Sequence, residues 1–234
     1  MNKICSSFRQ AIRDITDHSI LMIDGFAGPG GTPQNLIRAL EEHGAKRLTV
    51  ISNTAGLASV IGFGTLPGDR PIDIGILIEN NQVDKIIASF PISPSRSRPT
   101  AFERVYREGN IELELVPQGT LAERIRAGGA GIPAFYTPTG VGTQIARGKE
   151  TREFAGKTYV MEKAITADFA LIRGHKADTL GNVVYKGTSQ NFNGVMATAA
   201  ETTIVEVDEL LDPSEISANS IGTPGIYIDR IIPI

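Results

Sequence analysis

The stretch ILMIDGFAGPGGTPQNLIRALEEHGAKRLTVI, residues 20–51, decides the fold class of this chain. Its first four residues, 20–23, are an apolar run that predicts a buried strand. Residues 32–33, Thr-Pro, predict a helix start with an N-cap followed by proline at the first helical position. Gly44 predicts the end of that helix, and residues 47–51 predict the next strand. A strand, a helix and a second strand in this order are typical of a parallel sheet with a crossover helix.

The rest of the chain first continues this alternation of strands and helices and then becomes richer in predicted strands. Strands are predicted at residues 83–90 and 111–116, and helices at 102–107 and 121–126. After about residue 151 we expect a hairpin at residues 154–160 and strands at 169–172, 183–185 and 203–207. We therefore predict an α/β fold, with a mostly parallel sheet flanked by helices, a more β-rich C-terminal half, and a single domain over residues 1–234.

Composition excludes several classes of protein. With 234 residues, 41% of them hydrophobic, the chain can bury a substantial core, and a net charge of −3 gives no reason to bind nucleic acid. The single cysteine, Cys5, can form neither an internal disulfide nor a cysteine-rich metal site, so we expect a cytoplasmic protein without a metal centre. The N-terminus does not resemble a secretory signal. Glycine, proline and polar residues interrupt both long uncharged runs, residues 48–68 and 127–146, so no membrane span is expected.

The glycine-rich run DGFAGPGGTP, residues 24–33, follows the first predicted strand and opens the first predicted helix. Free backbone N–H groups and the positive end of a helix suit a phosphate or a carboxylate. The run is neither a G-x-G-x-x-G fingerprint nor a P-loop, so it gives poor support to a nicotinamide cofactor or ATP. Taken alone, it also fits an ordinary βα turn that needs glycine for its backbone conformation.

Gln118 lies between the predicted strand 111–116 and the predicted helix 121–126, at the carboxyl end of a strand. Open α/β sheets place their ligands at such ends, and a glutamine amide there could donate to a developing oxyanion. A solvated loop glutamine is the competing interpretation.

Histidines and glutamates give no clear nucleophile or base. The three histidines are far apart in sequence and fit no triad, so surface or capping roles are expected for His18, His43 and His175. Glutamates on amphipathic helices and strand edges are usually solvated. This expectation applies to Glu103, Glu108, Glu123, Glu201 and Glu206.

Residues 101–143, AFERVYREGNIELELVPQGTLAERIRAGGAGIPAFYTPTGVGT, resemble the α (A) subunit of succinyl-CoA:3-oxoacid CoA-transferase and its bacterial relatives acting on 3-oxoadipate or acetoacetate. The resemblance continues through DFALI at residues 168–172, NFN at residues 191–193 and AETTIVEV at residues 200–207. It covers nearly the whole chain.

The resemblance implies an enzyme subunit that moves CoA from an acyl-CoA to a free carboxylic acid by a ping-pong mechanism. Acyl-CoA is then a substrate, and no permanently bound cofactor is expected. The nucleophile of this family is a glutamate in a Glu-Asn-Gly motif on the β subunit. This chain has Glu79-Asn80-Asn81 and Glu108-Gly109-Asn110 but no Glu-Asn-Gly. We therefore expect a hetero-oligomer in which a β partner supplies the glutamate.

The resemblance also implies functions for particular residues. Gln118 matches the family glutamine that helps to hold the oxyanion. The family's CoA-binding loop matches Gly25, Phe26, Ala27, Gly28, Pro29, Gly30 and Gly31. Asp24 stands where the family loop usually has its first glycine, and an extra residue precedes Gly31. Residues 64–72 and 91–99 are longer than the corresponding family segments.

The second of these longer segments, FPISPSRSRP at residues 90–99, contains Arg96 and Arg98. Its prolines restrain a loop after a strand, and arginine binds a carboxylate through two parallel hydrogen bonds. One of these arginines is therefore a candidate to bind the distal carboxylate of a diacid substrate, with a solvated basic loop as the alternative.

Two other functions fit the same sequence. An acyl-CoA hydrolase or a citrate-lyase-like transferase subunit would differ in the final acceptor. A non-catalytic acyl-CoA-binding module would bind the thioester without turnover. The test that best separates them is whether a chain carrying Glu-Asn-Gly accompanies this one.

Overall fold

The computed structural model describes residues 2–26, 31–61 and 72–234. Its strands are β1 Ile20–Ile23, β2 Leu48–Ile51, β3 Val83–Ala88, β4 Glu112–Leu115, β5 Ala134–Thr137, β6 Thr151–Phe154, β7 Lys157–Lys163, β8 Ala167–Asp178, β9 Val183–Val184, β10 Ala200–Leu211 and β11 Arg230–Pro233. Its α-helices are α1 Phe8–Ala11, α2 Gln34–His43, α3 Ala58–Ile61, α4 Gly75–Glu79, α5 Ala101–Arg107, α6 Gln118–Gly129 and α7 Asn193–Ala197.

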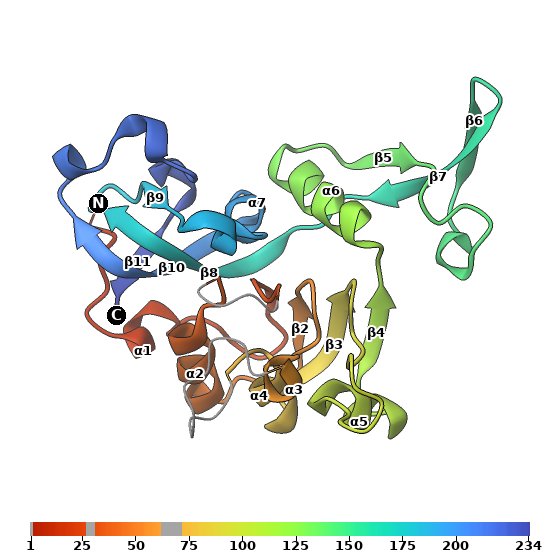
Figure 1. Cartoon of the computed structure of the whole chain (residues 1–234), viewed down its shortest axis with the longest axis horizontal. Coiled ribbons are helices and arrows are strands. Elements are labelled where there is room, and N and C mark those ends of the chain that lie inside the picture. The colour runs from red at the N-terminus through yellow and green to blue at the C-terminus, as the bar shows by residue number, and fades with distance from the viewer. Residues whose placement is uncertain (1, 27–30, 62–71) are drawn as a thin grey trace.

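The main sheet has eight strands in the order β11-β10-β8-β1-β2-β3-β4, with β9 attached to β8. Every pairing along this path is parallel, and only the β8–β9 pairing is antiparallel. A second, antiparallel sheet of three strands, β5-β7-β6, lies beyond α6 and away from the main sheet (Figure 1). The predicted α/β fold with a mostly parallel sheet is confirmed.

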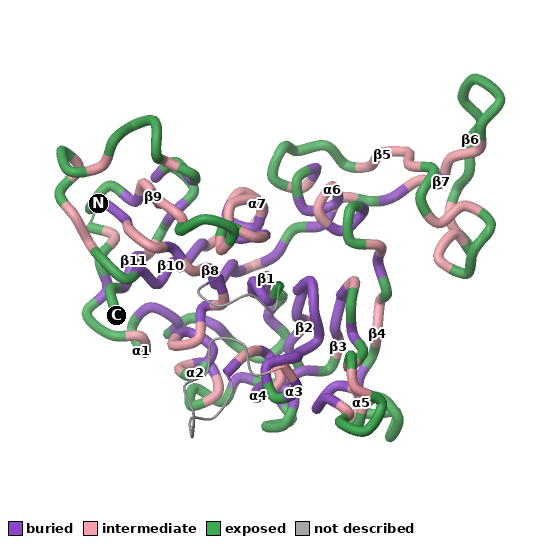
Figure 2. Tube along the Cα trace, viewed as in Figure 1, coloured by how far each residue is buried: buried purple, intermediate pink, exposed green. Residues whose placement is uncertain are grey.

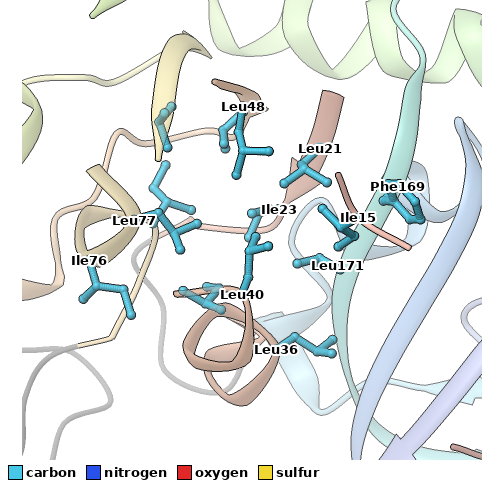
Figure 3. Close-up of a cluster of buried hydrophobic side chains, with 14 of the residues drawn as sticks. Ile15, Leu21, Ile23, Leu36, Leu40, Leu48, Ile76, Leu77, Phe169 and Leu171 are labelled. Carbon is cyan, nitrogen blue, oxygen red and sulfur yellow. The ribbon is translucent and has the colours of Figure 1, made fainter. Parts of the chain in front are cut away.

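Alternating side chains of the central strands pack against two layers of helices. Leu21 and Ile23 of β1 belong to the core cluster that includes side chains of α1, α2, α4 and α5. Figure 3 shows Ile23, Leu40 of α2 and Leu77 of α4 pointing toward one another. Met22 points the other way, into the cluster formed with α6 and α7. Because each buried aliphatic side chain contributes about 1.5–3 kcal/mol, this two-sided burial holds the sheet between its helices.

Burial is concentrated in the strands of the main sheet, as Figure 2 shows. The small sheet is largely exposed or intermediate, and all four residues of β6 are exposed. None of the helices in the described part of the chain combines the length and the apolar character needed to cross a membrane.

The predicted helix start at residues 32–33 is placed one residue too early. The helix α2 begins at Gln34, Pro33 stands at the N-cap, and no N-cap side chain caps it. The amide of Leu36 instead donates to the carboxylate of Glu206 on β10, at 2.8 Å. The predicted end is confirmed, because Gly44 adopts the left-handed conformation with φ of 79°.

Several predicted elements differ in extent. Helix α6 begins at Gln118, so this residue is the first of the helix and not part of a loop before it. The strands β8 and β10 each have 12 residues, because they pair along ten registered positions. The 154–160 hairpin is confirmed, with Ala155 and Gly156 both at positive φ in the turn. Two strands, β5 and β11, and the short helices α1, α3, α4 and α7 were not predicted from the sequence.

Candidate functional site

The carboxyl ends of β2 and β3 and the start of α6 meet at Asn53. The backbone oxygen of Asn53 accepts hydrogen bonds from the amides of Ser89, at 3.1 Å, and Phe90, at 2.9 Å. Its side-chain Oδ1 accepts from Gln118 Nε2 at 3.0 Å. Asn53 is only 3% exposed. It thus joins three segments at the edge where parallel sheets place their ligands.

Gln118 is exposed at this edge, at the N-terminus of the 12-residue helix α6. A side-chain amide nitrogen carries two hydrogens, and the bond to Asn53 uses one of them. The second has no acceptor among the residues that the structure describes. The Gln118 side chain is therefore oriented by one hydrogen bond and can donate another outward.

Of the glycine-rich run, the structure describes the two ends, and Ala27, Gly28, Pro29 and Gly30 lie outside the described residues. At Gly25, a Cβ would lie 2.7 Å from Ser52 Oγ. Thr54 Oγ1 donates to the Gly25 oxygen at 2.5 Å. At Gly31, a Cβ would lie 2.2 Å from Asn191 Nδ2 and 2.9 Å from the Ser189 oxygen. At Gly31 the close approach of a backbone oxygen leaves no room for a side chain, whereas at Gly25 the nearest atom is the Ser52 hydroxyl.

Phe26, the third described residue of this run, is 40% exposed. Its ring stacks against that of Phe192, with the ring centroids 6.0 Å apart and the planes at 29°. The segment before α7 therefore supports both ends of the run, Phe26 through this stack and Gly31 through Asn191 and Ser189.

Asp24, directly after β1, is fully buried. Asn193 Nδ2 donates to its Oδ2 at 2.9 Å. Burial raises the pKa of Asp24 to about 7, although donors on Asn191, Phe192, Gly25 and Asn193 favour the charged form. The first residue of the glycine-rich run is therefore a buried carboxyl group whose pKa is raised to about 7.

The N-terminus of α2, expected from the sequence to attract an anion, already holds one. The Leu36 amide donates to Glu206 Oε2, and Arg173 Nη1 donates to Glu206 Oε1 at 2.6 Å. Glu206 is 0% exposed, so the expectation that it is solvated is wrong. Burial raises the pKa of Glu206, while Arg173 and the amide favour its charged form. A ligand at the glycine-rich run must therefore use backbone groups other than the Leu36 amide.

Arg96 and Arg98 lie on the connection between β3 and α5, and both are exposed. Neither side chain has a hydrogen bond or ion pair within the described ranges. The loop itself is tied to α5, because the Ser93 amide donates to Glu103 Oε2 at 3.1 Å. Both guanidinium groups are therefore available to a ligand, but no hydrogen bond joins either of them to Gln118.

The histidines do not form a catalytic arrangement with the candidate site. His43, in the last turn of α2, has Nε2 2.7 Å from the Ile15 oxygen. His175 on β8 has Nδ1 2.7 Å from Asp208 Oδ2. Over the described ranges, no three His, Cys, Asp or Glu side chains are grouped as a metal ion would require.

The family model described as "Coenzyme A transferase" matches residues 5–233 of the chain. The chain belongs to the coenzyme A transferase family. The A subunit of the probable succinyl-CoA:3-ketoacid coenzyme A transferase of Bacillus subtilis is 45% identical over 99% of this chain and 90% of its own length. The A subunit of 3-oxoadipate CoA-transferase from Pseudomonas putida is 44% identical over 100% of this chain and 94% of its own length. The chain is thus similar along its whole length to the A subunits of CoA-transferases.

Solved structures agree on the fold of this coenzyme A transferase. Glutaconate coenzyme A-transferase from Acidaminococcus fermentans superposes with a TM-score of 0.81 at 17% identity, over 99% of this chain and 75% of that chain. An acyl-CoA transferase from Escherichia coli O157:H7 superposes with a TM-score of 0.80 at 20% identity, over 100% of this chain and 47% of that chain. At these identities the likeness shows the fold alone.

Three residues that organise this edge of the coenzyme A transferase were not predicted from the sequence as site residues. Asn53 had a usable signal, because the polar residues Ser52-Asn53-Thr54 directly follow a predicted strand. Asn193 and Glu206 had none, because nothing local to them indicates which distant segment they contact.

Proposed function

We propose that this chain is the A subunit of a heteromeric CoA-transferase that moves CoA from an acyl-CoA, such as succinyl-CoA, to a 3-oxoacid or another short carboxylic acid. The observation that carries the proposal is the identity of 44–45% along the full chain to proteins named for these reactions. The exposed Gln118 amide at the carboxyl edge of the sheet supports the same function. That the protein is single-domain and cytoplasmic is part of the proposal.

The proposed chemistry has two symmetrical halves. A glutamate carboxylate on the B partner attacks the thioester carbonyl, CoA leaves as a thiolate, and an acyl-enzyme anhydride forms. The thiolate then attacks the glutamyl carbonyl of the anhydride, which releases the first acid and leaves an enzyme-CoA thioester. The second acid reverses both steps and departs as the new acyl-CoA. The glutamate is assigned to the partner because this chain contains no Glu-Asn-Gly motif.

In this proposal the chain contributes binding and charge stabilisation. Each attack on a carbonyl places negative charge on its oxygen, and a preoriented N–H stabilises such an oxyanion. The second N–H of Gln118 is suited to that task, since Asn53 fixes the direction of the amide. The glycine-rich run, Gly25 to Gly31, is proposed to bind the CoA thioester, and Arg96 or Arg98 to bind a distal carboxylate of the acid.

The test uses this chain and its B partner, purified separately and then mixed. Transfer of CoA from succinyl-CoA to acetoacetate is expected only in the mixture, with a stable complex in gel filtration. Turnover by this chain alone would contradict the proposal. Release of free CoA without an acceptor acid would favour a hydrolase instead.

A further inference from the structure

The buried amide of Asn193 lies between Asp24 and Gly31. Its Nδ2 is 2.9 Å from Asp24 Oδ2 and 3.0 Å from the Gly31 oxygen. A third acceptor, the oxygen of Ser189, is 3.1 Å away. A primary amide nitrogen has two hydrogens, so three acceptors compete for two donors.

The Asn193 amide cannot escape this competition by turning over. Its Oδ1 accepts the backbone N–H of Arg173 on β8 at 2.9 Å, and the residue is 0% exposed. Turning the amide over would place its NH2 group against the Arg173 N–H and its oxygen against the three acceptor oxygens. Unpaired polar groups of this kind are costly in the interior. The side chain is therefore held with Nδ2 toward Asp24 and Gly31.

The charge on Asp24 decides how the two hydrogens are shared. A carboxylate is a stronger acceptor than a peptide carbonyl, so ionised Asp24 takes one hydrogen and leaves the other to Gly31 and Ser189. Protonated Asp24 is a weaker acceptor, and each carbonyl can then receive a hydrogen of its own. With burial raising the pKa of Asp24 to about 7, both forms are accessible near neutral pH.

The surroundings of Asp24 allow this titration without a second ionising group. Burial raises the pKa of the Tyr185 phenol to about 12, and the charge on Asp24 adds to this shift, so Tyr185 stays neutral. The Arg173 guanidinium is bound by Glu206 and Asp208. Asp24 is 0% exposed, and burial makes its charged form costly. The surrounding donors offset only part of that cost.

We propose that Asp24 is a positioning residue of the acyl-CoA site: by competing with Gly31 for the amide hydrogens of Asn193, it controls how firmly the end of the glycine-rich run is held. The inference rests on the proposed function, since it takes this run to bind the thioester. Protonated Asp24 leaves Gly31 firmly held, and a binding segment held in place binds its ligand more tightly. Ionised Asp24 loosens it and weakens acyl-CoA binding.

The kinetic test compares the complex of this chain and its B partner with the same complex carrying Asp24→Asn. Asparagine is a neutral acceptor of nearly the same shape and imitates protonated Asp24. From pH 6 to pH 8, the KM for succinyl-CoA should rise about fivefold more in wild type than in the variant, the effect of losing one net hydrogen bond. The ratio of the wild-type kcat to the variant kcat should not change with pH. The same holds for the ratio of the two KM values for acetoacetate.

Asp178→Asn is the matched control. Asp178 is another buried carboxyl, and it accepts from Asn182 Nδ2 at 2.7 Å in the β8–β9 turn. The ratio of the succinyl-CoA KM of Asp178→Asn to that of wild type should not change with pH. The inference would be overturned if the succinyl-CoA KM of Asp24→Asn changed with pH in the same way as that of wild type. It would also be overturned if Asp178→Asn altered the pH dependence of this KM as much as Asp24→Asn does.

A second measurement needs no activity. Amide hydrogen exchange of the peptide containing Gly31, corrected for base catalysis, should accelerate in the wild-type chain between pH 6 and pH 8. Asp24→Asn should not show this acceleration. Unchanged wild-type protection refutes the inference whether or not the complex transfers CoA. If the exchange accelerates as expected but the complex transfers no CoA, the effect of Asp24 on Gly31 is supported and the proposed function is refuted.

Discussion

Gln118 Nε2 donates a 3.0 Å hydrogen bond to Asn53 Oδ1, which joins the first residue of α6 to the segment that follows β2. These residues are 65 positions apart in the chain. The bond fixes the glutamine amide at the carboxyl edge of the sheet while it leaves one N–H directed outward. With one N–H bonded to Asn53 and the other without an acceptor among the described residues, the Gln118 amide can present a hydrogen-bond donor in a constant direction.

Substitution of Gln118 tests its proposed role. Gln118→Ala should lower kcat about a hundredfold, the scale of losing one oxyanion donor, with a smaller change in KM. Gln118→Glu removes the N–H groups while keeping the volume of the side chain, so it should lose at least as much. Steady-state kinetics of the complex measures both. Parent rates in a folded Gln118→Ala complex would reduce the residue to a structural contact.

Gly31→Ala should destabilise the chain by about 1–3 kcal/mol, because the added Cβ would meet the Ser189 oxygen and the buried Nδ2 of Asn191. Gly119→Ala is the matched control, since a Cβ there meets nothing within 4 Å and alanine favours the helix. Urea unfolding of both variants gives the comparison. Equal stability of Gly31→Ala and wild type would show that the close approach does not constrain this position.

The acid specificity of the complex tests Arg96 and Arg98. If one of them binds a distal carboxylate, its alanine variant should lose about tenfold in kcat/KM for succinate and little for acetate, since only the diacid has that group. Arg107→Ala is a control, because Arg107 is an exposed arginine on α5 that pairs with Glu103 at 3.7 Å. Equal losses for both acids, or none, would assign Arg96 and Arg98 to a solvated loop.

The stability of the chain should carry a pH dependence due to Asp24. Its pKa is raised from 3.8 to about 7 on folding, so the folded state retains a proton that the unfolded state releases between these values. The wild-type free energy of unfolding should therefore fall with rising pH, by up to about 1.4 kcal/mol per unit. Asp24→Asn lacks this contribution.

Urea unfolding at several pH values measures this contribution as a difference between the two proteins. Between about pH 4 and pH 7 the stability of Asp24→Asn relative to wild type should increase, and above about pH 7 it should stay constant. Other titrating groups are common to both proteins and cancel. A constant difference across the whole range would mean that Asp24 keeps its ordinary pKa in the fold.

Local sequence patterns predicted most strands of the main sheet and the helices α2, α5 and α6, but not the short helices α1, α3, α4 and α7. The apolar run of β1, the face of α2 and the left-handed Gly44 depend on neighbours within a few residues, so a short window contains their cause. The strands β5 and β11 were missed because their extent depends on pairing with distant β7 and β10.

What the sequence by itself determined was the alternation of strands and helices and the position of Gln118 after a strand. Only the tertiary structure decided which polar groups meet: Asn193 reaches Asp24 from 169 positions away, and Glu206 caps α2 from 170 positions away. The physical reason is the strand order, because parallel pairing of β8 with both β1 and β10 brings these segments to one face. Buried polar groups must then satisfy one another there, and no local pattern encodes such partners.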